Sequence, residues 1–405
     1  MTEFQSGFIA LMKGSLLETV PTVPDGFDYM EAYRLAEEHQ VVPLLYYSAA
    51  TLPSFLQSTA MGAFFQRSCS YISHSAHQED VLNKLFSLFD KEGISYMPLK
   101  GTVLKSLYPS PEMRVMGDAD ILIRLDEYDR IRQVMTAISG VEFSESDHEY
   151  IWMISSKLSI ELHKHLIPSY NKDYYAYYGD GWQLARPMTE GSTRYVMSDE
   201  DMLIYLFTHF AKHYRDKGAG IKYVVDFFVY RRAHPHMDMQ YLEREMTKLH
   251  LWDFYRHIMH LVDVWFCDAE PDEMSDYLTE KIFFDGVFGR NENSAASEGL
   301  KLSKTTKSVK RKKAMQMAFP PYASMCLKYP VLKKWAILLP FLWVWRWLTV
   351  LFGDRRKLKK VRSTLDQMSD ERISDYQREL NYVGLDYYFD EEDDPPKDNK
   401  NGKTP

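Results

Sequence analysis

Two carboxylates stand two residues apart in the segment Gly117-Asp-Ala-Asp-Ile-Leu-Ile123. Its alternation of polar and apolar residues predicts a strand, and the period of two places Asp118 and Asp120 together on the face opposite to the apolar residues. Neighbouring carboxylates repel each other, and burying them unpaired is costly. A divalent cation would neutralise them. A set of oxygen ligands suits Mg²⁺, which binds through one or two carboxylates plus substrate phosphates.

A third carboxylate lies on a second predicted strand. In Leu158-Ser-Ile-Glu-Leu-His163 apolar and polar residues alternate, so we expect Glu161 and His163 to point away from the core. If this strand lies beside the Asp118 strand, Glu161 completes a triad able to hold two metal ions, which stabilise the attacking and leaving oxygens of a phosphoryl displacement. The competing interpretation is a solvated strand face. The apolar flanks, the upstream Lys-Gly turn and the strand bearing Glu161 together favour a metal site.

Local signals predict the elements around these carboxylates. Residues 95–98 end a short strand, and apolar residues from Lys100 to Leu107 have helical spacing. The two prolines of the segment that begins at Tyr108 break this helix. Lys100 and Arg114 flank it and are candidates for phosphate contacts, the arginine through its bidentate fork.

Four segments together resemble a known family. They are Met97-Pro-Leu-Lys-Gly101, Tyr108-Pro-Ser-Pro-Glu-Met-Arg114, Gly117-Asp-Ala-Asp-Ile-Leu-Ile123 and Glu161-Leu-His163. The sequence is similar to the uncharacterised nucleotidyltransferase family of the polymerase-β superfamily over about residues 5 to 385. The wider superfamily has a Gly-Gly or Gly-Ser pair where this sequence, like this particular family, has a Lys-Gly pair.

The resemblance implies a site and a cofactor. The catalytic, metal-binding carboxylates would be Asp118, Asp120 and Glu161. Two Mg²⁺ ions would be the cofactor, with Mn²⁺ as an alternative. The expected nucleotide-contact residues are Lys100, Gly101, Thr102 and Arg114.

Further candidates lie on a predicted helix that begins at residue 198 and carries His209, Lys212 and His213. The H-x-x-x-H spacing can bind zinc, but the metalloprotease motif needs Glu directly after the first His, and Phe stands there. Two interpretations stay open. Either a histidine hydrogen-bonds Asp226 of the next helix, or His209, Lys212 or Lys222 contacts the substrate.

Composition limits the classes of function. The 405 residues are 45% hydrophobic and 26% charged, which is typical of a globular protein. The net charge of −8 argues against broad binding to nucleic acid. Three scattered cysteines without a C-x-x-C motif and the lack of a signal peptide predict a cytoplasmic protein.

One apolar segment tests this prediction. Residues 335–352 are apolar except for Pro340, Arg346 and Thr349, close to the length of a membrane span. The proline and the central arginine argue against a span. We therefore expect a helix packed on the protein and no membrane span.

The expected fold class is α+β: a small mixed β-sheet nucleotidyltransferase core embedded between N-terminal and C-terminal helical regions. The expected regions are 1–90 (helical), 91–190 (α/β core), 191–290 (helical, substrate side), 291–313 (polar and basic linker), 314–385 (helical) and 386–405 (disordered acidic tail).

The leading functional hypothesis is an Mg²⁺-dependent nucleotidyltransferase. It would move a nucleoside monophosphate from an NTP to an acceptor hydroxyl of a small molecule or a protein. The first alternative is a nucleotide- or partner-binding module with little or no turnover. The second is an RNA- or tRNA-directed enzyme that docks through the basic run at 304–313. The negative net charge of the chain argues against this second alternative.

Overall fold

The computed structural model describes residues 1–286, 289, 293–294, 296–297, 300, 315, 318–320, 322–353 and 370–387. The chain divides into two compact units. Within the described residues, the larger unit comprises 1–211 and 219–286, and the smaller comprises 212–218 and the described residues from 289 to 387. Most of the linker predicted at 291–313, its basic run at 304–313 and the tail beyond residue 387 lie outside the described residues.

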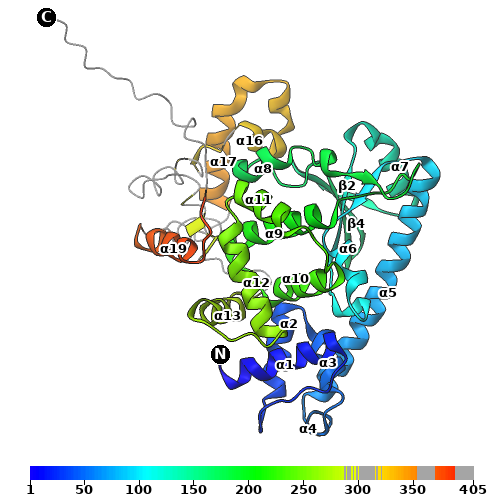
Figure 1. Ribbon diagram of the computed structural model, residues 1–405. Coiled ribbons are helices and arrows are strands. Elements are labelled where there is room, and N and C mark those ends of the chain that lie inside the picture. The colour runs from blue at the N-terminus through cyan, green and yellow to red at the C-terminus, as the bar shows by residue number, and fades with distance from the viewer. Residues whose placement is uncertain are drawn as a thin grey trace, which may run out of the picture. The chain divides into compact units, whose positions relative to one another are not determined.

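A five-stranded mixed sheet forms the centre of the larger unit (Figure 1). Its strand order is β1-β2-β5-β4-β3, and only the β2–β5 pair is parallel. The strands are β1 (Tyr96–Pro98), β2 (Asp118–Ile123), β3 (Val141–Glu145), β4 (Glu149–Ser155) and β5 (Leu158–His163). The predicted α+β class with a small mixed sheet is confirmed.

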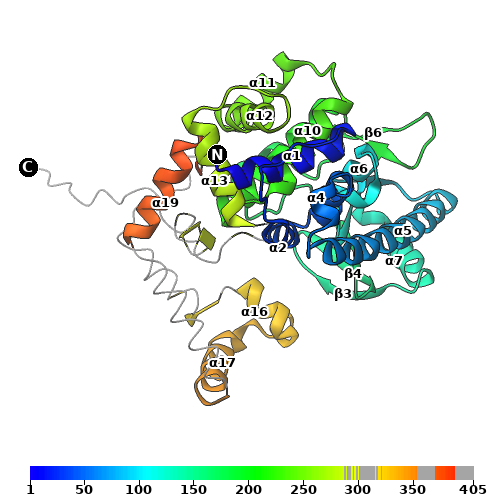
Figure 2. The same ribbon diagram turned by 90° about the horizontal axis from the view of Figure 1, so that it is seen from below.

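One face of this sheet packs into an apolar core of the larger unit. Helices α5 (Met61–Glu92) and α7 (Tyr128–Ala137) cover it and lie side by side in Figure 2. Alternate residues of β2 and β5, such as Ile121 and Ile160, are fully buried against them. The other residues of both strands therefore face away from the core, on the side of the sheet where α9 and α10 lie in Figure 1.

Helices make up the rest of the larger unit. The N-terminal ones begin at capping residues, as Thr2 forms a capping box and Asp28 accepts from two backbone amides. They are α1 (Glu3–Leu17), α2 (Tyr29–His39), α3 (Val42–Ala49) and α4 (Pro53–Leu56). The later ones are α6 (Gly101–Leu104), α8 (Lys172–Tyr178), α9 (Asp199–Lys217), α10 (Ile221–Ala233), α11 (Met239–Lys248), α12 (Trp252–Phe266) and α13 (Glu273–Asp285). A short pair, β6 (Arg186–Pro187) and β7 (Tyr195–Val196), precedes α9.

The smaller unit contains a helical hairpin built from α16 (Tyr322–Lys328) and α17 (Leu339–Gly353), besides the later helix α19 (Asp370–Tyr382). No helix in the described part of the chain is long and apolar enough to cross a membrane. The expectation that the segment 335–352 packs against the protein is wrong for one side of α17. Phe341 and Trp345 are exposed, whereas Leu342 and Trp343 pack on the small core of the hairpin.

Candidate functional site

Three carboxylates meet on the polar face of the sheet. The parallel register of β2 and β5 pairs Asp120 directly with Glu161, and Asp118 with Ser159. Paired residues of adjacent strands point to the same face, so Glu161 lies on the face of both aspartates. His163, two residues further along β5, shares this face.

Asp120 is buried, and one of its carboxylate oxygens accepts hydrogen bonds from two side chains. Its Oδ1 accepts a hydrogen bond from the Lys100 ammonium and another from His163 Nε2, which lies 2.7 Å away. The ring of His163 is held in turn, since its Nδ1 lies 3.0 Å from His148 Nε2. Because an ionised carboxylate only accepts, the proton of His163 belongs on Nε2. Asp120 is thus neutralised by the protein itself.

Lys100 reaches Asp120 from a strained turn. Its φ of 45° and ψ of −120° lie in a region that glycine adopts readily and other residues avoid. The turn is anchored beside the strand, as the Leu99 amide donates to the Asp120 carbonyl at 3.0 Å. A Cβ on Gly101 would stand 2.9 Å from the Met116 sulfur, so a larger residue there would require the Met116 side chain to move. Such backbone strain is typical of functional sites and amounts to about 1–3 kcal/mol.

Burial and neighbouring charges raise the pKa of Glu161, whereas the neighbours of Asp120 lower its pKa. Burial, followed by the negative charges of Asp120, Asp118 and Glu149, raises the pKa of Glu161 to about 8. Burial by itself would also raise the pKa of Asp120, but the Lys100 charge and the His163 hydrogen bond outweigh it and hold that pKa well below its usual range. Asp120 is therefore anionic at neutral pH, whereas Glu161 needs a nearby cation to ionise fully.

The residues on this face fit a divalent cation. Ligand atoms of Asp120, Glu161 and His163 lie within 4.8 Å of one another. A bound cation would offset both the burial and the repulsion that raise the pKa of Glu161. Asp118 is exposed and lies outside this close group, two residues earlier on the same strand face.

Three residues of the site were missed in the sequence. His148 and Glu149 form a second close group with His163, again within 4.8 Å. Counting back from the turn between β4 and β5 places Tyr150 opposite His163. A register shift between Met153 and Ser155 makes Glu149 the partner instead, which the sequence does not reveal. Tyr205 of α9 is fully buried and its hydroxyl has no hydrogen-bond partner among the described residues. Helical spacing alone marks Tyr205 only as a core residue.

Two side chains of the predicted site region bind Asp226. Arg114 Nε donates to Asp226 Oδ1 at 2.6 Å, and the Tyr108 hydroxyl donates to the same oxygen at 2.7 Å. Arg114 and Asp226 are both almost fully buried. The arginine therefore binds a carboxylate of α10 where a phosphate contact was expected. Among the described residues, the donors to Asp226 are these two side chains and no histidine.

The other predicted residues are dispersed. Thr102 is the second residue of α6, and its hydroxyl oxygen is buried with no partner in the described part of the chain. His209 lies on α9 with its ring centroid 6.4 Å from that of Tyr205. Lys212 and His213 follow on the same helix, in the stretch that belongs to the smaller unit. Their contact with a substrate stays a prediction.

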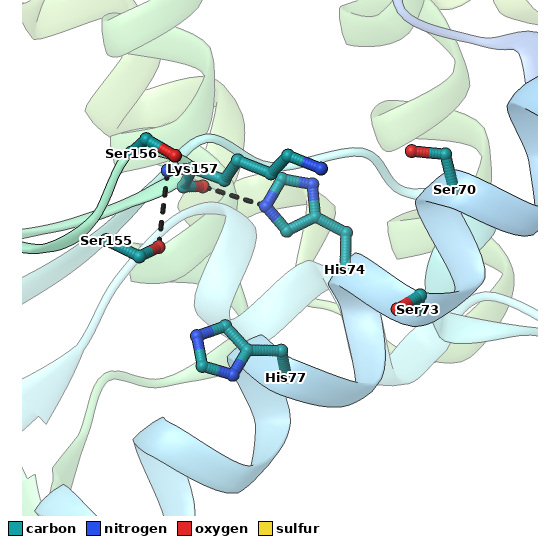
Figure 3. A pocket seen from close by; sticks show the side chains of 7 residues that line it. All are labelled: Ser70, Ser73, His74, His77, Ser155, Ser156 and Lys157. Carbon is teal, nitrogen blue, oxygen red and sulfur yellow. Dashed lines mark hydrogen bonds between the residues drawn. The ribbon is translucent and has the colours of Figure 1, made fainter.

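A pocket of about 340 Å³ opens between α5 and the β4–β5 turn (Figure 3). In it, His74 Nε2 lies 3.0 Å from the backbone oxygen of Lys157. The turn leads directly into Ser159, the residue beside Asp118. One lysine and four serine hydroxyls without a carboxylate suit an anionic, oxygen-rich group. The lining residues are Ser70, Ser73, His74, His77, Ser155, Ser156 and Lys157.

Comparison with known proteins agrees with this geometry. No curated protein and no solved structure matches the chain at a significant level. The model of a family described as "Uncharacterised nucleotidyltransferase" matches residues 25–267, more than half of the chain. This match spans all five strands of the central sheet and the helices from α2 to α12. The chain therefore belongs to the uncharacterised nucleotidyltransferase family, whose general role is nucleotidyl transfer.

Proposed function

We propose that the protein moves a nucleoside monophosphate from an NTP to an acceptor hydroxyl on the polar face of the sheet, with release of pyrophosphate and of the hydroxyl proton. The observation that carries this proposal is the register that pairs Asp120 with Glu161, with Asp118 on the same face. Phosphoryl chemistry requires little from a protein beyond positioning and charge neutralisation. Three carboxylates on one face of the sheet can hold cations, which position the phosphates and neutralise their charge.

The proposed cation ligands are Asp118, Asp120 and Glu161, for two Mg²⁺ ions or for Mn²⁺ in their place. Bound cations neutralise the phosphate charge and make the acceptor hydroxyl easier to deprotonate. Lys100 and His163 keep Asp120 ionised and oriented. Glu161 is the proposed acceptor of the hydroxyl proton, a role that it can take once a bound cation keeps it ionised.

The start of α6 is the proposed contact with the nucleotide phosphates. Lys100 brings an ammonium to the carboxylate face, and the buried Thr102 hydroxyl leaves one polar group for a ligand. Gly101 allows close approach of the backbone. Arg114 was expected to share this contact. Its Nε donates to Asp226 and its Nη1 to the Val115 carbonyl, so a phosphate would have to share this arginine with them.

The competing function is a nucleotide-binding module without turnover. One observation favours it, since the Lys100 ammonium already occupies an oxygen of Asp120 that a metal would use. A labelling experiment separates the two. The full chain is incubated with a cell lysate, Mg²⁺ and one of four NTPs labelled at the α-phosphate.

Transfer predicts that the label enters one acceptor fraction, requires the cation and disappears with Asp120→Asn. The position of the label, in a small molecule, a protein or RNA, identifies the acceptor class. NTP binding without label transfer would favour the binding module. If the protein bound none of the four NTPs in the presence of Mg²⁺, both proposed functions would be ruled out.

A further inference from the structure

The helical hairpin of the smaller unit exposes an apolar surface. We define its exposed aromatic face as Trp335, Ile337, Phe341, Val344, Trp345 and Leu348. The first five side chains are 58–77% exposed, and Leu348 is 43% exposed. Apolar side chains gathered in this way mark an interaction site more often than singly scattered ones do.

The exposed residues of α17 recur at helical spacing. Phe341, Val344, Trp345 and Leu348 follow the spacing i, i+3, i+4, i+7, which places them in one stripe along α17. The opposite side of the hairpin is packed, because Leu339, Leu342 and Trp343 contact a core of Met325, Cys326 and Leu332.

The indole N–H groups of two other tryptophans on α17 donate to backbone carbonyls just before α16. Trp343 Nε1 donates to the Pro320 carbonyl at 3.0 Å, and Trp347 Nε1 donates to the Ala318 carbonyl at 2.8 Å. The hairpin therefore has its own core and hydrogen bonds without the exposed aromatic face. That face is left for a partner.

Charge indicates what the partner is. The sequence from 299 to 353 contains no aspartate or glutamate, although the whole chain has a net charge of −8. The hairpin itself carries Lys328, Lys333, Lys334 and Arg346. A second copy of the hairpin would repel it, because each hairpin carries these cations and no carboxylate. An anionic surface would attract it.

The length of the helix limits how it meets such a surface. Helix α17 has 15 residues and is about 22 Å long, shorter than the roughly 30 Å of a bilayer's hydrocarbon core. A helix too short to span can bury an exposed apolar stripe by lying in the plane of the lipid–water interface. Tryptophan is the residue most enriched at that depth together with tyrosine.

We propose that the exposed aromatic face of the hairpin docks the protein on an anionic phospholipid bilayer, in the plane of the interface and without crossing it. This binding is independent of the proposed nucleotidyl transfer. It makes the protein peripheral, held by apolar contact and by attraction of its cations to the lipid headgroups.

The test is flotation of the full chain with vesicles of phosphatidylcholine, with and without phosphatidylglycerol. We expect binding to the anionic vesicles, weaker binding to the neutral ones and loss of binding at high salt. The double variant Phe341→Gln with Trp345→Gln should weaken binding about tenfold or more. Both side chains are exposed, so folding should survive.

The matched control is Phe143→Gln on β3, because Phe143 is 72% exposed, as is Phe341. It should bind vesicles like the unchanged protein. Equal binding of the double variant and the control would overturn the proposal, as would no binding to anionic vesicles. Protein that stays bound after a carbonate wash would be inserted, which contradicts docking in the interface. If the double variant instead turned a lipid-free dimer into a monomer, the face would be a contact between copies.

Discussion

The Lys100 ammonium donates a hydrogen bond to Oδ1 of Asp120, the second carboxylate of the Asp-x-Asp pair. Lysine and aspartate are both largely buried, and the lysine adopts a positive φ to make this contact. The site therefore contains a cation of its own, next to the carboxylates that would bind a metal. Metal binding and the Lys100 contact compete for the same oxygen, and the first prediction follows from this competition.

Replacing Lys100 should strengthen divalent-cation binding and weaken transfer. Lys100→Gly and Lys100→Ala both remove the competing ammonium, so Mg²⁺ should raise the melting temperature more than it does in the unchanged protein. Transfer should fall, because a phosphate contact is lost. The glycine variant should be about 1 kcal/mol more stable to unfolding than the alanine variant, since only glycine adopts the positive φ freely. Unchanged Mg²⁺ affinity in both variants would contradict the competition.

Asp120→Asn should abolish transfer and also destabilise the protein without metal. Transfer should fall by about 10³-fold or more, because one lost transition-state contact reduces the rate about 10²–10³-fold and a displaced metal removes several. Repulsion from Asp118 alone would make the asparagine neutral or stabilising. The contacts with Lys100 and His163 reverse that sign, since a buried lysine would lose its charged partner.

Asp118→Asn is the control for this prediction. Asp118 is exposed, so its variant should keep the melting temperature while losing transfer. A melting curve of each variant with and without Mg²⁺ and NTP measures both effects. If Asp120→Asn melted at or above the temperature of the unchanged protein, the Lys100 contact would not stabilise the fold.

The stability of the metal-free protein should fall as the pH rises toward 8. The pKa of Glu161 is about 8 in the fold and 4.5 for an ordinary glutamate, so the folded state holds a proton that the unfolded state releases between these values. Its contribution to the free energy of unfolding is present below about pH 4.5 and decreases by up to about 1.4 kcal/mol per pH unit in this window. Glu161→Gln should lack this slope. The measurement is denaturant unfolding of both proteins from pH 5 to 9; parallel curves would rule out the raised pKa.

The Arg114–Asp226 ion pair should act as a structural unit. Removing either partner leaves a buried charge without compensation, so Asp226→Ala or Arg114→Ala should reduce the free energy of unfolding by about 3–5 kcal/mol. The double variant should lose clearly less than the sum of the two. Additive losses in a denaturant titration would mean that the pair does not couple, and the phosphate contact first expected of Arg114 would regain support.

Local pattern in the sequence determined the faces of the two central strands. The period of two is set by each strand's own backbone, so Asp118, Asp120, Glu161 and His163 fall on the polar face without knowledge of their neighbours. Helical spacing determines the apolar positions of α9 in the same way, and Leu206 and Phe207 on that face are buried. These features depend only on residues that are close together in the chain.

Only the tertiary structure decided which side chains meet. Arg114 and Asp226 are 112 residues apart, and Lys100 reaches Asp120 through a backbone conformation that no residue pattern signals. Long-range pairs depend on strand register and helix packing, in which many alternatives satisfy the same periodicity. The exposed stripe of α17 follows the same rule. Its spacing shows an apolar face, but whether protein covers that face depends on the surface available elsewhere in the fold.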